Sequence, residues 1–171
     1  MTPDTTTIAS ATPPAVPPDH VIPSRYQVIE TISAGQEDAL YLARRLDTGA
    51  LVDLRILSGR LGADRVLVTA LVQQATLVTR VAGECPGIAT VHECERTPNG
   101  LMLAMERPKG STLRDVIKRE GALDLKRAPV LAARLGEVVE TVHNLGLVHG
   151  GLRPENVVLV GAEERVVLKH L

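Results

Sequence analysis

The order of the apolar segments constrains the fold of this chain more than any other feature of its sequence. Short runs with strand-like alternation come first, a helix-like segment interrupts them, and further helix-like segments and two short apolar runs follow. The predicted strands cover residues 26–32, 39–44, 51–57, 88–95, 101–106, 157–160 and 165–168, and the predicted helices cover 64–81, 111–121 and 126–145. Strands grouped ahead of helices, without internal repeats, predict an α+β fold with two lobes.

Polar residues and a proline mark several ends of these elements. Asp64 and Ser111 have side chains that can cap the first turns of the first two helices. Pro129 lies near the start of the third helix, where a missing backbone N–H disturbs the helix least. The segment LDTG at 46–49 predicts a hairpin turn between the second and third strands.

The first 24 residues differ in composition from the rest of the chain. They are rich in threonine and alanine and contain prolines at positions 3, 13, 14, 17, 18 and 23. Proline removes backbone donors and favours extended conformations. Residues 1–24 are therefore predicted to form a disordered leader ahead of the folded unit.

Composition and charge exclude several function classes. The 171-residue chain has a net charge of −1, two tyrosines and no phenylalanine or tryptophan, so it lacks the basic surface and aromatic platforms typical of nucleic-acid binding. Cys85 and Cys94 have neither a CxxC spacing nor a matching histidine pair, which predicts reduced thiols and no zinc site. No apolar run reaches the roughly 20 residues of a membrane span and no secretion signal is visible, so the predicted compartment is the cytoplasm.

Four sequence segments, taken in order, carry a family resemblance. These segments are RYQVIETISAGQEDALYLARRLDTGALVDLRIL, CPGIATVHEC, LMLAMERPKGSTLRDVI and VHNLGLVHGGLRPENVVL. They resemble the first three strands, the approach to the fourth strand, the fifth strand with the hinge and next helix, and the catalytic loop of bacterial-type Ser/Thr protein kinases. The resemblance covers residues 25–171. It implies a five-stranded antiparallel sheet with one helix in an N-lobe at 25–106, followed by a hinge and a truncated, mainly helical C-lobe at 107–171.

The resemblance also assigns catalytic positions, and four of them carry altered residues. Arg55 replaces the lysine that holds the ATP phosphates, and Gln74 replaces the glutamate that pairs with that lysine. Gly151 replaces the aspartate that accepts the substrate proton, and His170 replaces the aspartate that binds magnesium. Glycine offers no proton acceptor and a neutral glutamine forms no ion pair, so these positions predict that phosphotransfer is lost.

The loop and strand that would cover ATP are altered as well. Only Gly35 keeps a glycine of the phosphate-covering loop, and Asp38 would bring a negative charge toward the phosphates. Asp53 lies at the position that packs on adenine in the family. Because Asp53 and Arg55 are two residues apart on one strand, they are predicted to pair with each other and to fill part of the cleft.

Weak ATP binding stays open, because the backbone of the hinge remains. The resemblance implies this lining for a vestigial nucleotide cleft: Gly35, Leu40, Asp53, Arg55, Met105, Glu106, Arg107 and Asn156. Asn156 is interpreted as a loop amide bonded to nearby backbone, and His149 as a packed histidine beneath the loop. No bound cofactor and no metal site are predicted.

The sequence therefore predicts a catalytically inactive pseudokinase, not an enzyme, that serves as a scaffold or regulatory module. Two alternatives stay open: a residually active or ATP-binding Ser/Thr kinase-like transferase, and a structural subunit of a larger assembly that reuses the fold. A protein partner or self-association is expected, because a truncated C-lobe would leave an apolar stripe of the third helix uncovered. The stripe consists of Leu131, Leu135, Val138, Val142 and Leu145.

Overall fold

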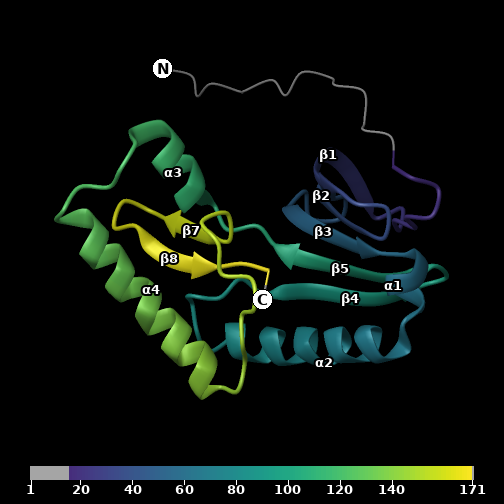
Figure 1. Ribbon diagram of the computed structural model, residues 1–171. Coiled ribbons are helices and arrows are strands. Elements are labelled where there is room, and N and C mark those ends of the chain that lie inside the picture. Colours follow the sequence, from purple (N-terminus) through teal and green to yellow (C-terminus); the bar gives the residue numbers. More distant parts are fainter. Residues whose placement is uncertain (1–15, 171) are drawn as a thin grey trace.

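Alternating apolar side chains build the sheet of the first lobe, at the right of Figure 1. Its strands are β1 (Tyr26–Ala34), β2 (Asp38–Arg45), β3 (Leu51–Leu57), β4 (Val91–Thr97) and β5 (Gly100–Glu106). They lie in the order β1-β2-β3-β5-β4, and every neighbouring pair is antiparallel. The computed structural model describes residues 16–170, and it confirms the predicted five-stranded antiparallel sheet.

Helix α2 (Arg65–Ala82) covers one face of this sheet, after the short helix α1 (Gly59–Ala63). As predicted, Asp64 caps α2: its side chain accepts hydrogen bonds from the N–H groups of Val66 and Leu67, at 2.9 and 3.0 Å. The buried side of α2 consists of Val68, Ala75, Val78 and Val81, which pack with Leu57, Leu101 and Leu103 of the sheet. The core of the first lobe thus lies between α2 and the sheet.

The second lobe combines two helices with a small sheet. Its elements are β6 (Gly110–Thr112), α3 (Leu113–Glu120), α4 (Arg127–Asn144), β7 (Val157–Val160) and β8 (Arg165–Leu168). The strands form a sheet in the order β6-β7-β8, which includes the predicted hairpin and a strand, β6, that was not predicted. Ser111 lies within β6, so its prediction as a helix cap is wrong. Thr112 caps α3 instead, accepting a hydrogen bond from Asp115 N–H at 3.1 Å.

The predicted apolar stripe of α4 is largely covered within the chain. Leu131 and Val142 are buried, while Leu135 and Val138 pack against the apolar side chains of the β7–β8 hairpin and its surroundings. Only Leu145 is exposed, by 37%. The expectation that this stripe forms a free surface for a partner is therefore wrong.

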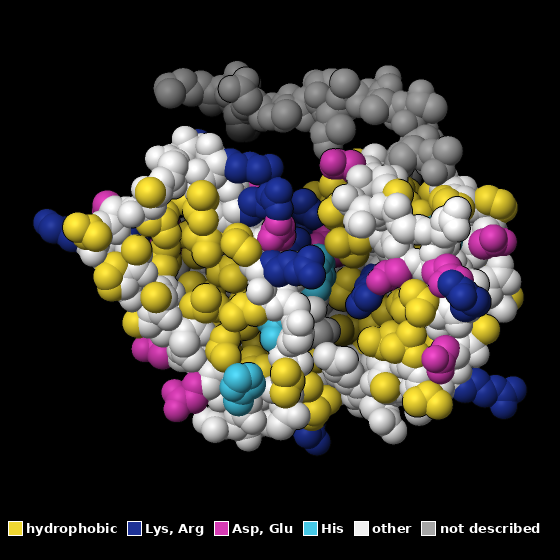
Figure 2. Space-filling model, viewed as in Figure 1, with side chains coloured by type: hydrophobic (Ala, Val, Ile, Leu, Met, Phe, Trp, Pro, Cys, Tyr) yellow, Lys and Arg dark blue, Asp and Glu magenta, His cyan; other side chains and the backbone are white. Residues whose placement is uncertain are grey.

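Other apolar side chains of the second lobe do reach the surface. Figure 2 shows apolar side chains gathered over this lobe, at the left of the view. The exposed large ones are Ile117, Leu125, Val130, Leu145, Val148 and Leu152. Association with a partner or with a second copy stays a prediction.

Backbone hydrogen bonds join the end of β8 to the segment that leads into β4. Leu168 N–H donates to Gly87 carbonyl and Ala89 N–H donates to Leu168 carbonyl, both at 2.8 Å. Leu168 also forms an isolated parallel bridge with Ile88. This attachment carries the next two residues, Lys169 and His170, toward the sheet of the first lobe.

Part of the predicted leader packs on the first lobe. Residues 1–15 lie outside the described residues, but residues 16–24 lie beside the first lobe, at the right of Figure 1, and pack against the face of the sheet opposite α2. Val16 and Ile22 pack against the apolar outer face of the sheet, and His20 is buried. We call residues 16–24 the N-terminal strap. The prediction of a disordered leader does not hold for these nine residues.

Two composition-based predictions can be compared with the described residues. Cys85 is buried and Cys94 half-buried, and both are free thiols, as predicted. No helix within residues 16–170 is long and apolar enough to cross a membrane.

The cap of α2 gives a direct stability test. Replacing Asp64 with alanine removes the acceptor for two backbone N–H groups and should lower the free energy of unfolding by about 1 kcal/mol. Urea unfolding measures this change. The Asp64→Asn variant keeps a capping oxygen and should stay within about 0.5 kcal/mol of the original protein. Equal losses in the two variants would contradict the assigned cap.

Candidate active site

The sheet register places Asp53 at the centre of the predicted cleft. Asp53 lies in the middle of β3, opposite Leu42 of β2 and Met105 of β5. Its side chain is completely buried and points to the side where the chain emerges from β8. An ionised carboxylate is stable in such a position only when charged partners surround it.

Three side chains supply these partners, and we call the group the Asp53 cluster. Asp53 Oδ1 accepts from Arg107 Nη1 at 2.5 Å, while Oδ2 accepts from Lys169 Nζ at 3.2 Å and is 2.9 Å from His170 Nε2. Arg107 follows β5, and Lys169 and His170 follow β8, so the cluster links both lobes to the hinge between them. In Figure 2 basic, acidic and histidine side chains meet between the lobes.

The cluster keeps Asp53 ionised in spite of its burial. Burial by itself raises the pKa of a carboxyl group, because it disfavours the charged form. Here the hydrogen bond from His170 and the charges of Lys169 and Arg107 outweigh burial and lower the pKa of Asp53 to about 2. Asp53 is therefore a fixed negative charge at neutral pH.

Arg55 takes a different partner from the one predicted. Asp53 and Arg55 do not pair with each other: the Arg55 guanidinium forms a two-pronged contact with Asp38, with distances of 2.9 Å to Oδ1 and 2.6 Å to Oδ2. The two residues come from adjacent strands, since Leu40 of β2 lies opposite Arg55 of β3. The bonds with Asp38 raise the pKa of Arg55 above its usual value. The Asp38 carboxylate is thus offset by a guanidinium and is not a free anion facing the cleft.

The loop between β1 and β2 turns sharply at Gly35. A Cβ atom there would lie 2.4 Å from the carbonyl oxygen of Asp38, which accepts a hydrogen bond from Gly35 N–H at 3.2 Å. Only glycine fits this approach. Leu40, a few residues later, is half-buried and packs against the core beside α2.

Gln74 does not pair with Arg55. It is half-buried on α2, and in the described part of the chain its side chain forms no hydrogen bond with Arg55, whose guanidinium nitrogens bond to Asp38. The family's pair between strand and helix is therefore replaced by a pair between two strands.

The loop before β7 is held by short-range hydrogen bonds. Asn156 Nδ2 donates to Gly151 carbonyl at 2.8 Å, and Gly151 N–H lies 3.2 Å from His149 Nδ1. Both observations agree with the predicted backbone-bonded amide and packed histidine, since His149 is buried. Burial lowers the pKa of His149, and its Nε2 has no hydrogen-bond partner within the described residues.

The hinge offers fewer backbone donors than expected. Met105 is buried in the core, and Glu106 N–H donates to Thr90 carbonyl at 2.8 Å. Pro108 has no N–H. Among residues 106–108, the backbone N–H of Arg107 is the remaining donor. The Arg107 side chain points toward Asp53 and bonds to it.

A magnesium ion does not fit the residues that the structure describes. Magnesium prefers several hard oxygen ligands. Within residues 16–170 no group of three or more histidine, cysteine, aspartate or glutamate side chains could hold a metal. His170 bonds to Asp53, and Asn156 offers a single amide oxygen. No step of the chemistry below is therefore assigned to a metal.

Lys169 is the site residue that sequence reasoning missed. It is buried and pairs with Asp53 across 116 positions of sequence. A signal did exist: Asp53 and Lys169 are opposite charges that each interrupt or end an apolar strand. Two such charges are good candidates for a buried pair, because neither is stable in a core alone.

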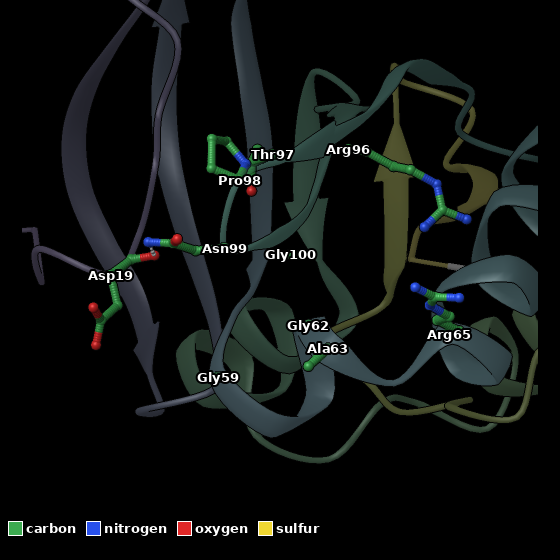
Figure 3. Close-up of a pocket in the computed structure, with 10 residues that line it drawn as sticks. All are labelled: Asp19, Gly59, Gly62, Ala63, Arg65, Arg96, Thr97, Pro98, Asn99 and Gly100. Atoms are coloured by element: carbon green, nitrogen blue, oxygen red, sulfur yellow. Dashed lines mark hydrogen bonds between the residues drawn. The ribbon is translucent and has the colours of Figure 1, made fainter.

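A cavity far from these residues lies at the other end of the first lobe. It has a volume of about 510 Å³ and lies between α1, the start of α2 and the β4–β5 turn (Figure 3). Arg65 and Arg96 border it, together with backbone of the turn. It contains none of the predicted cleft residues.

The Asp53 cluster predicts a specific pH dependence. Because the pKa of Asp53 is lower in the folded protein than its usual value near 4, its stabilising effect is present above pH 4 and is lost as the pH falls toward 2. Replacing Asp53 with asparagine leaves Lys169 buried without a counter-charge and should lower the free energy of unfolding at pH 7 by about 3 kcal/mol. Urea unfolding between pH 2 and 7 measures both effects.

A matched control is available on the surface. Asp47 pairs with Arg45 in an exposed turn, so Asp47→Asn should change stability by less than about 0.5 kcal/mol. A loss in Asp53→Asn no larger than in this control would show that the cluster contributes nothing to folding.

Comparison with known proteins identifies the family. The model of the protein kinase domain matches residues 26–169. A probable serine/threonine-protein kinase of Clostridium perfringens is 24% identical over 147 residues, which are 86% of this chain and 21% of the relative. A serine/threonine-protein kinase of Myxococcus xanthus is 27% identical over 82% of this chain and 17% of its own length. The human calcium/calmodulin-dependent protein kinase type 1B is 30% identical over 80% of this chain and 38% of its own length.

These findings overturn one prediction. The chain was expected not to be an enzyme, because four catalytic positions differ from the family. That expectation is wrong, since the matching model is that of the protein kinase domain and the relatives are named as protein kinases. The chain spans between 17% and 38% of the length of these three relatives. Both its fold and the order of its segments agree with the match, and the chain belongs to the protein kinase family.

Proposed function

We propose that this chain is the nucleotide-binding part of an ATP-dependent Ser/Thr protein kinase. ATP would lie between the two lobes, with its adenine toward the hinge and its phosphates toward the β1–β2 loop and the end of β8. The names of the relatives support this class of reaction, because they are serine/threonine protein kinases. The two-lobed fold with a hinge at residues 105–107 supports the position of the nucleotide.

The observation that carries the proposal is the charge of the Asp53 cluster. Lys169 and Arg107 bring two formal positive charges to one negative charge, which leaves an excess of +1 even when His170 is neutral. Arg55 lies on the same strand and adds a guanidinium that a single carboxylate offsets. Fixed cations in a shielded site are what a triphosphate requires.

A bound triphosphate would compete with carboxylates for these cations. Arg55 is about 40% exposed beside Asp38, so its guanidinium can turn from the carboxylate to a phosphate without uncovering a buried charge. Lys169 is buried against Asp53 and can be shared only when the lobes move slightly apart. We therefore assign the first phosphate contact to Arg55 and a later contact to Lys169.

The transfer step needs positioning more than covalent chemistry. The hydroxyl oxygen of a serine or threonine forms the new bond to the γ-phosphorus while the bond to ADP breaks. Because Gly151 has no side chain, the hydroxyl proton would pass to an oxygen of the transferred group or to solvent. Loss of a general base typically slows such a reaction by about 10²–10⁴-fold, so a slow enzyme is expected.

Binding and transfer can be tested on the same sample. Millimolar ATP should raise the melting temperature of the full chain by several degrees, since 100 times the dissociation constant stabilises by about 2.7 kcal/mol. Adenosine, which lacks phosphates, should produce a much smaller shift. Transfer of labelled γ-phosphate to a mixture of Ser- and Thr-containing peptides measures the reaction. If ATP produces no shift in melting temperature and no labelled peptide forms, the proposal is contradicted.

Position 151 gives a sharper test of the reaction type. A Cβ added at Gly151 would lie 3.8 Å from its nearest neighbours, Asn156 Nδ2 and His149 Nδ1, so a larger residue fits there. Replacing Gly151 with aspartate supplies the missing proton acceptor and should raise the transfer rate at least about tenfold. Gly151→Asn has nearly the same shape but no basic carboxylate, and should leave the rate unchanged. Equal rates in the two variants would exclude proton transfer at this position.

A further inference from the structure

The N-terminal strap reaches the loop that would cover the phosphates. Its apolar residues Val16 and Ile22 pack on the outer face of the sheet, and Asn99 Nδ2 donates to Asp19 carbonyl at 3.3 Å. Between these contacts His20 enters the protein and is only 4% exposed. A histidine buried at a surface strap needs specific partners for both ring nitrogens.

The hydrogen-bond partners of His20 define the tautomer of its neutral ring. Nε2 lies 3.3 Å from the carbonyl oxygen of Gln36, which can only accept, so Nε2 carries the proton. Nδ1 lies 2.6 Å from the hydroxyl of Tyr41 and accepts from it. A neutral ring thus satisfies both contacts, and the Tyr41 ring meets it edge-on at 5.9 Å.

Gln36 lies at the tip of the β1–β2 loop, and its carbonyl is held twice. Ser58 Oγ donates to the same oxygen at 3.2 Å, and Ser58 N–H donates to Glu37 carbonyl at 2.8 Å. The Glu37 side chain in turn accepts from Arg60 N–H at 3.1 Å. The loop is therefore hydrogen-bonded to the strap on one side and to the segment after β3 on the other.

This fastening orients the peptide bond after Gln36. In a trans peptide the carbonyl and the following N–H point in opposite directions. A Gln36 carbonyl fixed on His20, on the outer side of the sheet, directs Glu37 N–H away from the strap. This N–H donates no hydrogen bond within the described part of the chain. It is therefore free for an acceptor that does not belong to the described part of the chain.

We propose that His20 is a positioning residue that, through Gln36, aims the backbone N–H of Glu37 at the phosphates of ATP. This inference rests on the proposed nucleotide-binding function and adds a control element to it. The strap then acts as part of the nucleotide site although it touches no nucleotide. Displacing the strap removes one of the two hydrogen bonds on Gln36 carbonyl and loosens the loop without changing the cleft residues.

Two substitutions of His20 separate positioning from packing. Glutamine places its Nε2 near the histidine Nε2 and can still donate to Gln36 carbonyl. Asparagine places its Nδ2 near the histidine Nδ1, keeps a contact with Tyr41 and does not reach Gln36. Hydrogen exchange of the Gly35 and Ser58 amides reports on the loop, because these N–H groups bond to Asp38 and Glu37 carbonyls.

His20→Asn should speed the exchange of the Gly35 and Ser58 amides about fivefold and weaken ATP binding by a similar factor, the effect of one lost hydrogen bond. His20→Gln should stay within about twofold of the original protein in both measurements. Equal behaviour of the two variants would overturn the positioning role, and so would unchanged loop exchange in His20→Asn. The amide exchange rates of the two variants can differ while ATP binds neither the variants nor the original chain. In that case the contact between His20 and the loop is supported. The role of this contact in ATP binding and the proposed function are then both contradicted.

Discussion

The buried carboxylate of Asp53 is the constraint on which the arrangement of the two lobes depends. An ionised group without solvent needs partners, and Arg55, on the same face of β3, pairs with Asp38 instead. Arg107 reaches it from the hinge, while Lys169 and His170 reach it from the segment after β8. Because these partners belong to different parts of the chain, the charge of one strand residue links the two lobes and the hinge.

The same constraint determines what the cleft can do. Asp53 is engaged by Lys169, and Arg55, the cation of β3, pairs with Asp38. Gln74 of α2 therefore has no role in pairing with Arg55. Cations therefore remain between the lobes, but each is shared with a carboxylate that a triphosphate would have to replace. The β1–β2 loop above them is held from outside by Ser58 and His20. Under the proposed function, ATP would therefore bind by small movements of the lobes and the loop.

Local patterns predicted much of the fold but few of its long-range contacts. Short apolar runs between turns predicted the bounds of β3, β7 and β8 as the structure has them. Strand β6 was missed, since three residues carry no pattern and its partner Val160 lies far along the chain. The pairing of Asp53 with Arg55 was wrong for the same reason: spacing on one strand says nothing about Lys169. The expectation of an inactive protein rested on four altered positions taken together, whereas family membership rests on the whole order of segments.

The coupling between Asp53 and Lys169 tests the account most directly. A double-mutant cycle compares the free energies of unfolding of Asp53→Asn, Lys169→Met and the double variant with that of the original chain at pH 7. If the two side chains form a buried pair across the lobes, the double variant should be more stable than the sum of the single losses predicts, by about 1–3 kcal/mol. Additive losses, with a coupling energy near zero, would show that this contact does not hold the lobes together.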